Sequence, residues 1–149
     1  MTSTTPTEEM SYLDRSIRLF EVENPSELGD ASGSMLFLGI YGLSLSPAER
    51  MGLVRAIQDG NALAVFIAGE ESASVFDDLL QALSIEATPR PIMTKYSARN
   101  AKEAIEIFLQ ATWPYEERFD EWKSYTIVSY ASPMEPLRAA VKRIVFGST

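Results

Sequence analysis

Cysteine and histidine are both absent from this chain of 149 residues. Without cysteine there are no disulfides, thiol nucleophiles, zinc ribbons or cysteine-held iron–sulfur clusters. Without histidine there is no Ser-His-Asp catalysis, no HExxH zinc site and no imidazole proton shuttle. The sequence therefore predicts no catalytic residues, no metal site and no cofactor, and leaves open only an enzyme of unrecognised type.

Long apolar runs and targeting signals are missing as well. No segment reaches the roughly 18 consecutive apolar residues that a membrane-spanning helix requires. The first ten residues, MTSTTPTEEM, have neither the basic stretch nor the apolar stretch of a secretory signal. We therefore expect a cytoplasmic protein that does not bind membranes.

Basic side chains are scarce. The chain has 13 lysines and arginines against 21 aspartates and glutamates, which gives a net charge of −8. A field of this sign repels phosphate backbones, so nucleic-acid binding is not expected. A basic protein partner fits the charge better.

Length and composition indicate one folded unit. A chain of this length with 46% hydrophobic residues can bury a core of its own. We predict a frayed, disordered N-terminus over residues 1–7, a single domain over 8–146 and a tail over 147–149.

Apolar runs alternate with helical patterns along most of the chain. Strands are predicted at 36–41, 62–68, 92–96 and 124–130, each followed by an amphipathic helix, and the third strand is weaker and nearer an edge. This alternation predicts an α/β, three-layer fold with a mainly parallel sheet of four to five strands, flavodoxin-like or Rossmann-like. Residues 8–23 fit a helix or a strand, and a short helix running into an extended end is favoured because apolar residues recur there at helical spacing.

Helix starts are marked by serine. Ser46-Pro47-Ala48-Glu49 has the capping-box pattern, and Ser132-Pro133-Met134-Glu135 repeats it after the fourth strand. Ser97 is the expected cap of the helix after the third strand.

One candidate site follows from the predicted sheet. Ligands of open parallel sheets bind where the strand order reverses, and an order of 2-1-3-4 places that crevice between the loops after the first and third strands. Residues 87–102 contain bases and no acid. We predict a small-anion site there, with surface pairing of the same bases to Glu103 or Glu106 as the alternative. Its members are Gly42, Ser44, Lys95, Ser97 and Arg99.

The sequence lacks the phosphate-binding motifs of nucleotide-binding folds. Neither GxGxxG nor GxxxxGK[ST] is present. Glu70 and Glu71 follow the second strand, where they either compensate a helix dipole or bind Mg²⁺ weakly.

An aromatic and acidic segment stands out near residue 115. Tyr115, Phe119 and Trp122 have the spacing of one helical face, and acids occupy the positions between them. This face either binds a basic partner or a second copy of the chain, or packs back on the domain.

Several local motifs resemble a group of short uncharacterised bacterial proteins. They are Thr94-Lys95-Tyr96, the helix Glu103-Ala104-Ile105-Glu106-Ile107-Phe108, Trp113-Pro114 and Trp122. The resemblance covers residues 35–130, and members often have Trp-His where this chain has Lys95-Tyr96. It implies a bacterial, cytoplasmic α/β domain and no particular activity.

Two functions are compatible with these observations. The first is a non-catalytic binding or regulatory domain that acts through protein–protein contact. The second is a sensor of a small anionic ligand at the predicted crevice.

Overall fold

The computed structural model of the chain describes residues 8–41, 44–86, 91–97 and 100–147, so the predictions for residues 1–7 and for the last two residues lie outside it. The strands are β1 (Glu8–Tyr12), β2 (Arg15–Val22), β3 (Ser34–Ile40), β4 (Ala64–Gly69), β5 (Ile92–Tyr96) and β6 (Ser124–Tyr130). The α-helices are α1 (Pro47–Gly60), α2 (Ser72–Glu86), α3 (Ala101–Ala111) and α4 (Glu135–Val145), with short 3₁₀ helices η1 (Pro25–Glu27) and η2 (Glu116–Glu121).

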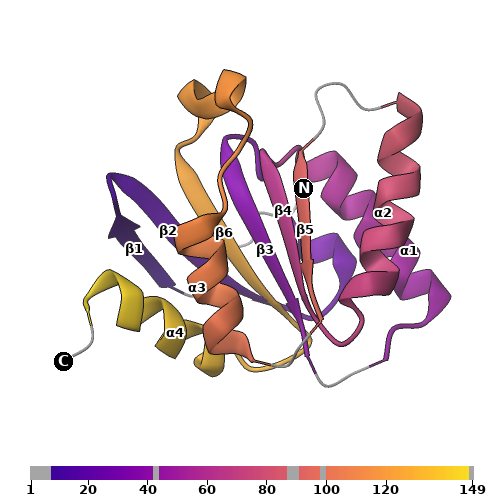
Figure 1. Cartoon of the computed structure of the whole chain (residues 1–149). Coiled ribbons are helices and arrows are strands. Elements are labelled where there is room, and N and C mark those ends of the chain that lie inside the picture. The colour runs from indigo at the N-terminus through magenta and orange to yellow at the C-terminus, as the bar shows by residue number, and fades with distance from the viewer. Residues whose placement is uncertain (1–7, 42–43, 87–90, 98–99, 148–149) are drawn as a thin grey trace.

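All six strands form one sheet in the order β1-β2-β6-β3-β4-β5 (Figure 1). Only β1 runs antiparallel, against β2, and the other neighbours are parallel. The α/β class and the mainly parallel sheet are confirmed, and β5 lies at an edge as expected. The predicted count of four to five strands was too low.

The additional strands come from the segment predicted as a short helix. Residues 8–22 form a β-hairpin, with Tyr12 paired to Arg15 across a two-residue turn. Both turn residues, Leu13 and Asp14, have positive φ (51° and 66°), as tight hairpin turns require. The helix prediction was wrong because Met10 and Ile17 also fit an alternating pattern, in which Ile17 and Leu19 of β2 are buried and the residues between and beside them are less so.

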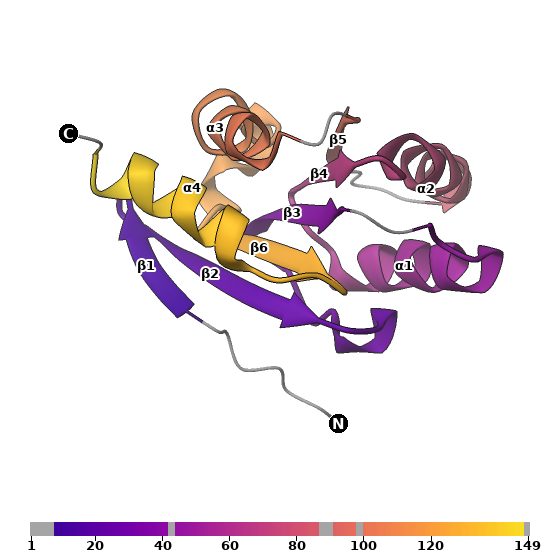
Figure 2. The same cartoon turned by 90° about the horizontal axis from the view of Figure 1, so that it is seen from below.

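Helices cover both faces of the sheet, with α3 and α4 on one side and α1 and α2 on the other (Figure 2). Every residue of β3, β4 and β6 is buried, which explains why these strands are apolar without alternation. The face under α3 and α4 carries an aromatic cluster in which the Phe108 ring lies 5.4 Å from Phe37 and 5.8 Å from both Phe66 and Tyr125, between ring centroids.

Of the three helix caps predicted above, the structure confirms one. Ser46 forms the predicted capping box with Glu49 at the start of α1. At α3 the prediction of Ser97 was wrong, because the helix begins later and Asn100 Oδ1 accepts the Glu103 N–H at 3.0 Å. At α4 the serine prediction was also wrong: the helix begins at Glu135 and no side chain of Ser132 caps it.

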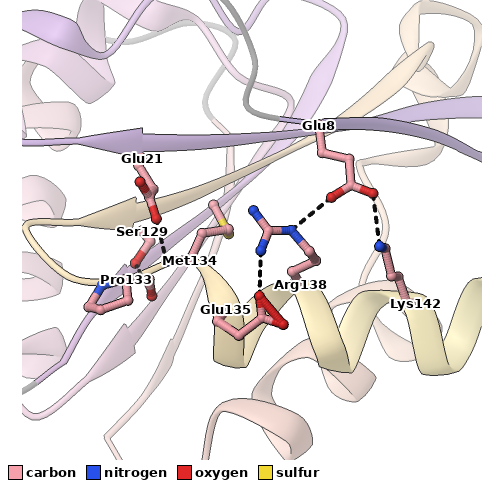
Figure 3. Close-up of polar contacts among 8 residues, drawn as sticks. All are labelled: Glu8, Glu21, Ser129, Pro133, Met134, Glu135, Arg138 and Lys142. Atoms are coloured by element: carbon pink, nitrogen blue, oxygen red, sulfur yellow. Dashed lines mark hydrogen bonds and ion pairs between the residues drawn. The ribbon is translucent and has the colours of Figure 1, made fainter.

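Ion pairs join α4 to the hairpin (Figure 3). Glu8 on β1 accepts from Arg138 at 2.7 Å and lies 3.2 Å from Lys142 Nζ. The bond to Lys142, more than that to Arg138, lowers the pKa of the Glu8 carboxyl. These ion pairs thus join the hairpin, near the start of the sequence, to the last helix, near its end.

Candidate functional site

The crevice predicted between the first and third parallel strands does not form. The order 2-1-3-4 was wrong, because β4 lies between β3 and β5. Strands separated by one neighbour are about 10 Å apart. The reversal of strand order lies instead between β3 and β6, which are adjacent.

The structure describes three of the five residues predicted to bind an anion. Gly42 and Arg99 lie outside the described residues. Ser44, Lys95 and Ser97 are exposed. The Lys95 ammonium lies 4.9 Å from the centroid of the Phe76 ring, so its side chain is directed along α2.

The protein's own polar groups fill the β6 side of the reversal point (Figure 3). Glu21 Oε2 accepts the Met134 N–H at 2.7 Å, which places a carboxylate at the start of α4. Ser129 Oγ lies 2.9 Å from both the carbonyl oxygen and the hydroxyl of Ser132. An internal carboxylate at a helix N-terminus satisfies the dipole that would otherwise attract an anion.

A cavity of about 410 Å³ lies elsewhere, on the α1 face of the sheet. We call it the crossover pocket. Its floor is formed by β2, β6 and β3, one wall by the end of α1, and its roof by residues 27–31. The residues that line it are Arg18, Phe20, Val22, Glu27, Leu28, Gly29, Asp30, Ala31, Leu36, Ala56, Ile57, Gly60, Thr126 and Val128.

The crossover pocket exists because the connection from β2 to β3 is short. Both strands pair with β6 in parallel, so residues 23–33 must cross over β6 to reach β3. The crossover contains only η1 and no α-helix, and it lies beside α1 (Figure 2). The Ala31 N–H donates to the Gly60 carbonyl at 2.7 Å, and a Cβ on Gly60 would lie 3.2 Å from the Gly29 oxygen. The roof is therefore fixed at the end of α1 and leaves space above β6.

Arg18 supplies the positive charge of the pocket. Its side chain is half-buried, and Nη2 donates to Ser124 Oγ at 3.2 Å. Among the described residues no acceptor faces its buried Nε. A guanidinium has five N–H donors, and the hydrogen bond to Ser124 uses one of them.

Two carboxylates in the roof oppose this charge. Asp30 Oδ1 accepts from the Ser32 N–H at 2.9 Å and from its hydroxyl at 2.7 Å. These bonds lower the pKa of Asp30, and the nearby charge of Arg18 lowers it further. Glu27 Oε1 accepts the Asn24 N–H at 3.1 Å. Asp30 is therefore ionised at neutral pH and held in place by its own loop.

The aromatic loop, residues 113–122, divides into a packed part and an exposed part. Trp122 stacks edge-on against Tyr125, with centroids 5.6 Å apart, and the Arg15 guanidinium lies 3.6 Å from the centre of its ring. Tyr115 and Phe119 stay 45% and 41% exposed, and Trp113 is 53% exposed. The three predicted residues do not form one helical face, because the segment is a 3₁₀ helix with three residues per turn.

The acids after β4 do not form a metal site among the described residues. No group of three or more potential ligands is found there. Glu71 Oε1 accepts the Leu45 N–H at 3.4 Å. Burial, assisted by the charge of Glu70, raises the pKa of the nearby Tyr41 hydroxyl.

Sequence reasoning missed the crossover pocket and Arg18. One signal was present: Arg18 stands between Ile17 and Leu19 in a short apolar run. If that run is a strand, the arginine must face the opposite side of the sheet from its neighbours. The other lining residues come from five elements and the loop after η1, and they share no local pattern.

Comparison with known proteins gives no family. No protein-family model matches this chain, and no curated protein matches it. Among the described residues, no helix combines the length and apolar character needed to cross a membrane.

Proposed function

We propose that this protein is a non-catalytic binding domain that takes a small, mainly apolar molecule with an anionic group into the crossover pocket. The single observation behind this proposal is the Arg18 guanidinium, whose Nε has no described partner, in the floor of a mostly apolar cavity. Small-molecule sites typically combine apolar walls with a few polar groups that orient the ligand. The volume of about 410 Å³ lies within the usual range for such sites, roughly 300–1,000 Å³.

Two expectations belong to this proposal. The four parallel strands covered by helices, β5-β4-β3-β6, follow the order 3-2-1-4 in chain sequence, which favours a Rossmann-like over a flavodoxin-like arrangement. We also propose that the domain acts in a bacterial cytoplasm.

The proposal predicts that an apolar aromatic sulfonate binds and that Arg18 determines its affinity. The probe is 1-anilinonaphthalene-8-sulfonate, with its fluorescence as the readout. Arg18→Met keeps the aliphatic stem and removes the charge. Because a hydrogen bond to a charged group contributes about 1.5–3 kcal/mol, we expect at least about tenfold weaker binding.

A matched control is available on α1. Arg55→Met changes the net charge by the same amount at an exposed position outside the pocket, and it should leave the affinity unchanged. Ala56→Phe fills the pocket from its α1 wall and should abolish binding. Equal affinities for the wild type, Arg18→Met and Ala56→Phe would show that the probe binds elsewhere and would contradict the proposal.

A second candidate function is contact with a basic protein segment through the aromatic loop. The observation that favours it is the exposure of Trp113, Tyr115 and Phe119 next to the exposed acids Glu116 and Glu117. Large aromatic side chains and opposite charge are the features that protein interfaces use for affinity and steering.

A peptide of alternating lysine and leucine tests this second function. We expect it to quench tryptophan fluorescence, and Glu116→Gln with Glu117→Gln to weaken binding several-fold because charge complementarity is lost. Asp59→Asn with Asp77→Asn removes the same charge at exposed sites on α1 and α2 and is the control. If both double variants lose affinity equally, the effect belongs to net charge and the aromatic loop is not the site.

A further inference from the structure

The charges of the crossover pocket suit a ligand that carries both signs better than a purely anionic one. One guanidinium and two carboxylates line the cavity, and Arg18 and Asp30 interact electrostatically. A ligand with only an anionic group would compete with Asp30 for the same guanidinium. A ligand that also carries a cationic group would gain a second ion pair instead.

The two charges are held by opposite sides of the pocket. Arg18 belongs to β2 in the floor, whereas Asp30 belongs to the roof. Most of the remaining lining is apolar and includes Phe20, Leu36 and Val128. The arrangement therefore presents a positive group, a negative group and an apolar surface to one small volume.

The loop that contains Asp30 holds its carboxylate in place for contact with a cationic group. Both of its hydrogen bonds from Ser32 go to Oδ1. Within the part of the chain that the structure describes, no hydrogen bond to Oδ2 is found, and this oxygen can accept from a ligand. A carboxylate already fixed in position loses little conformational freedom when it binds an ammonium group.

We infer that the ligand of the crossover pocket is a small zwitterion with an apolar side chain, that is, an α-amino acid of the leucine or phenylalanine class. This inference rests on the proposed function of the pocket. The ligand carboxylate pairs with Arg18, whose planar fork suits a bidentate contact. The ammonium group pairs with Asp30, and the side chain packs on the apolar floor.

Three matched compounds test the inference by calorimetry on the full chain. L-phenylalanine carries both charges, 3-phenylpropanoate lacks the amine and phenethylamine lacks the carboxylate. We expect phenylalanine to bind at least about tenfold more tightly than either analogue, because each analogue leaves one charged residue of the pocket unpaired. The leucine set, with 4-methylpentanoate and isopentylamine, is measured alongside and should show the same order.

Two variants assign the charges separately. Asp30→Asn retains Oδ1 as the acceptor for Ser32, and it should weaken phenylalanine binding about tenfold without weakening 3-phenylpropanoate. Arg18→Met should weaken phenylalanine and 3-phenylpropanoate but not phenethylamine. Asp59→Asn, at an exposed position on α1 outside the pocket, is the control for net charge and should change none of them. Thermal melting of each variant verifies that it is folded.

The possible outcomes distinguish failure of the zwitterion inference from failure of the proposed function, which is ligand binding in the crossover pocket. One outcome is that the naphthalene sulfonate binds in an Arg18-dependent manner, while 3-phenylpropanoate binds as tightly as phenylalanine and 4-methylpentanoate as tightly as leucine. That outcome overturns the zwitterionic ligand but supports the crossover pocket as a binding site. Absence of binding by every one of these compounds overturns both. Phenylalanine binding that is unchanged by Asp30→Asn also overturns the inference.

Discussion

Gly69→Ala should destabilise the protein by about 4 kcal/mol or more, a loss at the extreme end of single substitutions. Gly69 ends β4 and pairs with Ile40 on β3. Its φ is +115°, a conformation that side-chain-bearing residues rarely adopt, and a Cβ there would lie 1.7 Å from the Ile40 carbonyl oxygen. The neighbouring backbone would have to move, and with it the pairing of two central strands. Urea denaturation measures the loss.

Gly29→Ala provides the comparison. A Cβ on Gly29 meets nothing within 4 Å, so this variant should stay within about 0.5 kcal/mol of the wild type. The same substitution at two glycines then differs only in the space and backbone conformation around it. A Gly69→Ala variant that is as stable as Gly29→Ala would mean that the ends of β3 and β4 are not packed as described.

Raising the pH from about 9 to about 12 should remove several kcal/mol of folding free energy through tyrosines whose pKa is raised by burial, Tyr125 and Tyr130 together with Tyr41. Burial raises the pKa of Tyr125 to about 12, and burial together with the hydrogen bond to Glu49 raises that of Tyr130 to about 12. An ordinary phenol has a pKa of about 10. Between these values the unfolded chain releases protons that the folded chain retains, so stability falls as the pH rises. Each residue accounts for roughly 2–3 kcal/mol.

Urea midpoints at a series of alkaline pH values, with the ultraviolet absorbance of phenolate as a second signal, measure this dependence. Tyr130→Phe keeps the ring and removes one titrating group. At neutral pH this variant should be about 1 kcal/mol less stable than the wild type, because it lacks the hydrogen bond to Glu49. As the pH rises further, its stability should fall by less than that of the wild type. Tyr115→Phe, at an exposed ring, should leave the slope unchanged. A stability that stays constant up to pH 12 would contradict the burial of both hydroxyl groups.

The strand–helix alternation could be predicted because its signals are local. Residues such as Leu38 and Ile67 lie on strands buried on both faces, and such strands have apolar runs that need no knowledge of their neighbours. The Ser46 capping box is equally local. The hairpin could not be separated from a helix, since the apolar residues of this segment fit both periods.

The order of the strands in the sheet could not be predicted from the sequence. Parallel strands that are buried on both faces have interchangeable patterns, so nothing in residues 36–41 or 124–130 indicates that they are neighbours. The predicted crevice depended on that order and is absent with it, whereas the anion site itself stays a prediction. The crossover pocket could not be predicted for a related reason, because it is created by a connection that contains only a short 3₁₀ helix.

That short connection also determines which bonds hold the roof of the crossover pocket in place. The roof is stabilised by its own turns, in which the Glu27 and Leu28 N–H groups bond to Asn24 and Pro25, and it is fastened to α1 by the Ala31–Gly60 bond. None of these bonds belongs to the ladders between strands. A displacement of the roof would therefore leave the hydrogen bonds between neighbouring strands intact, and this is the movement that binding of the proposed ligand would require.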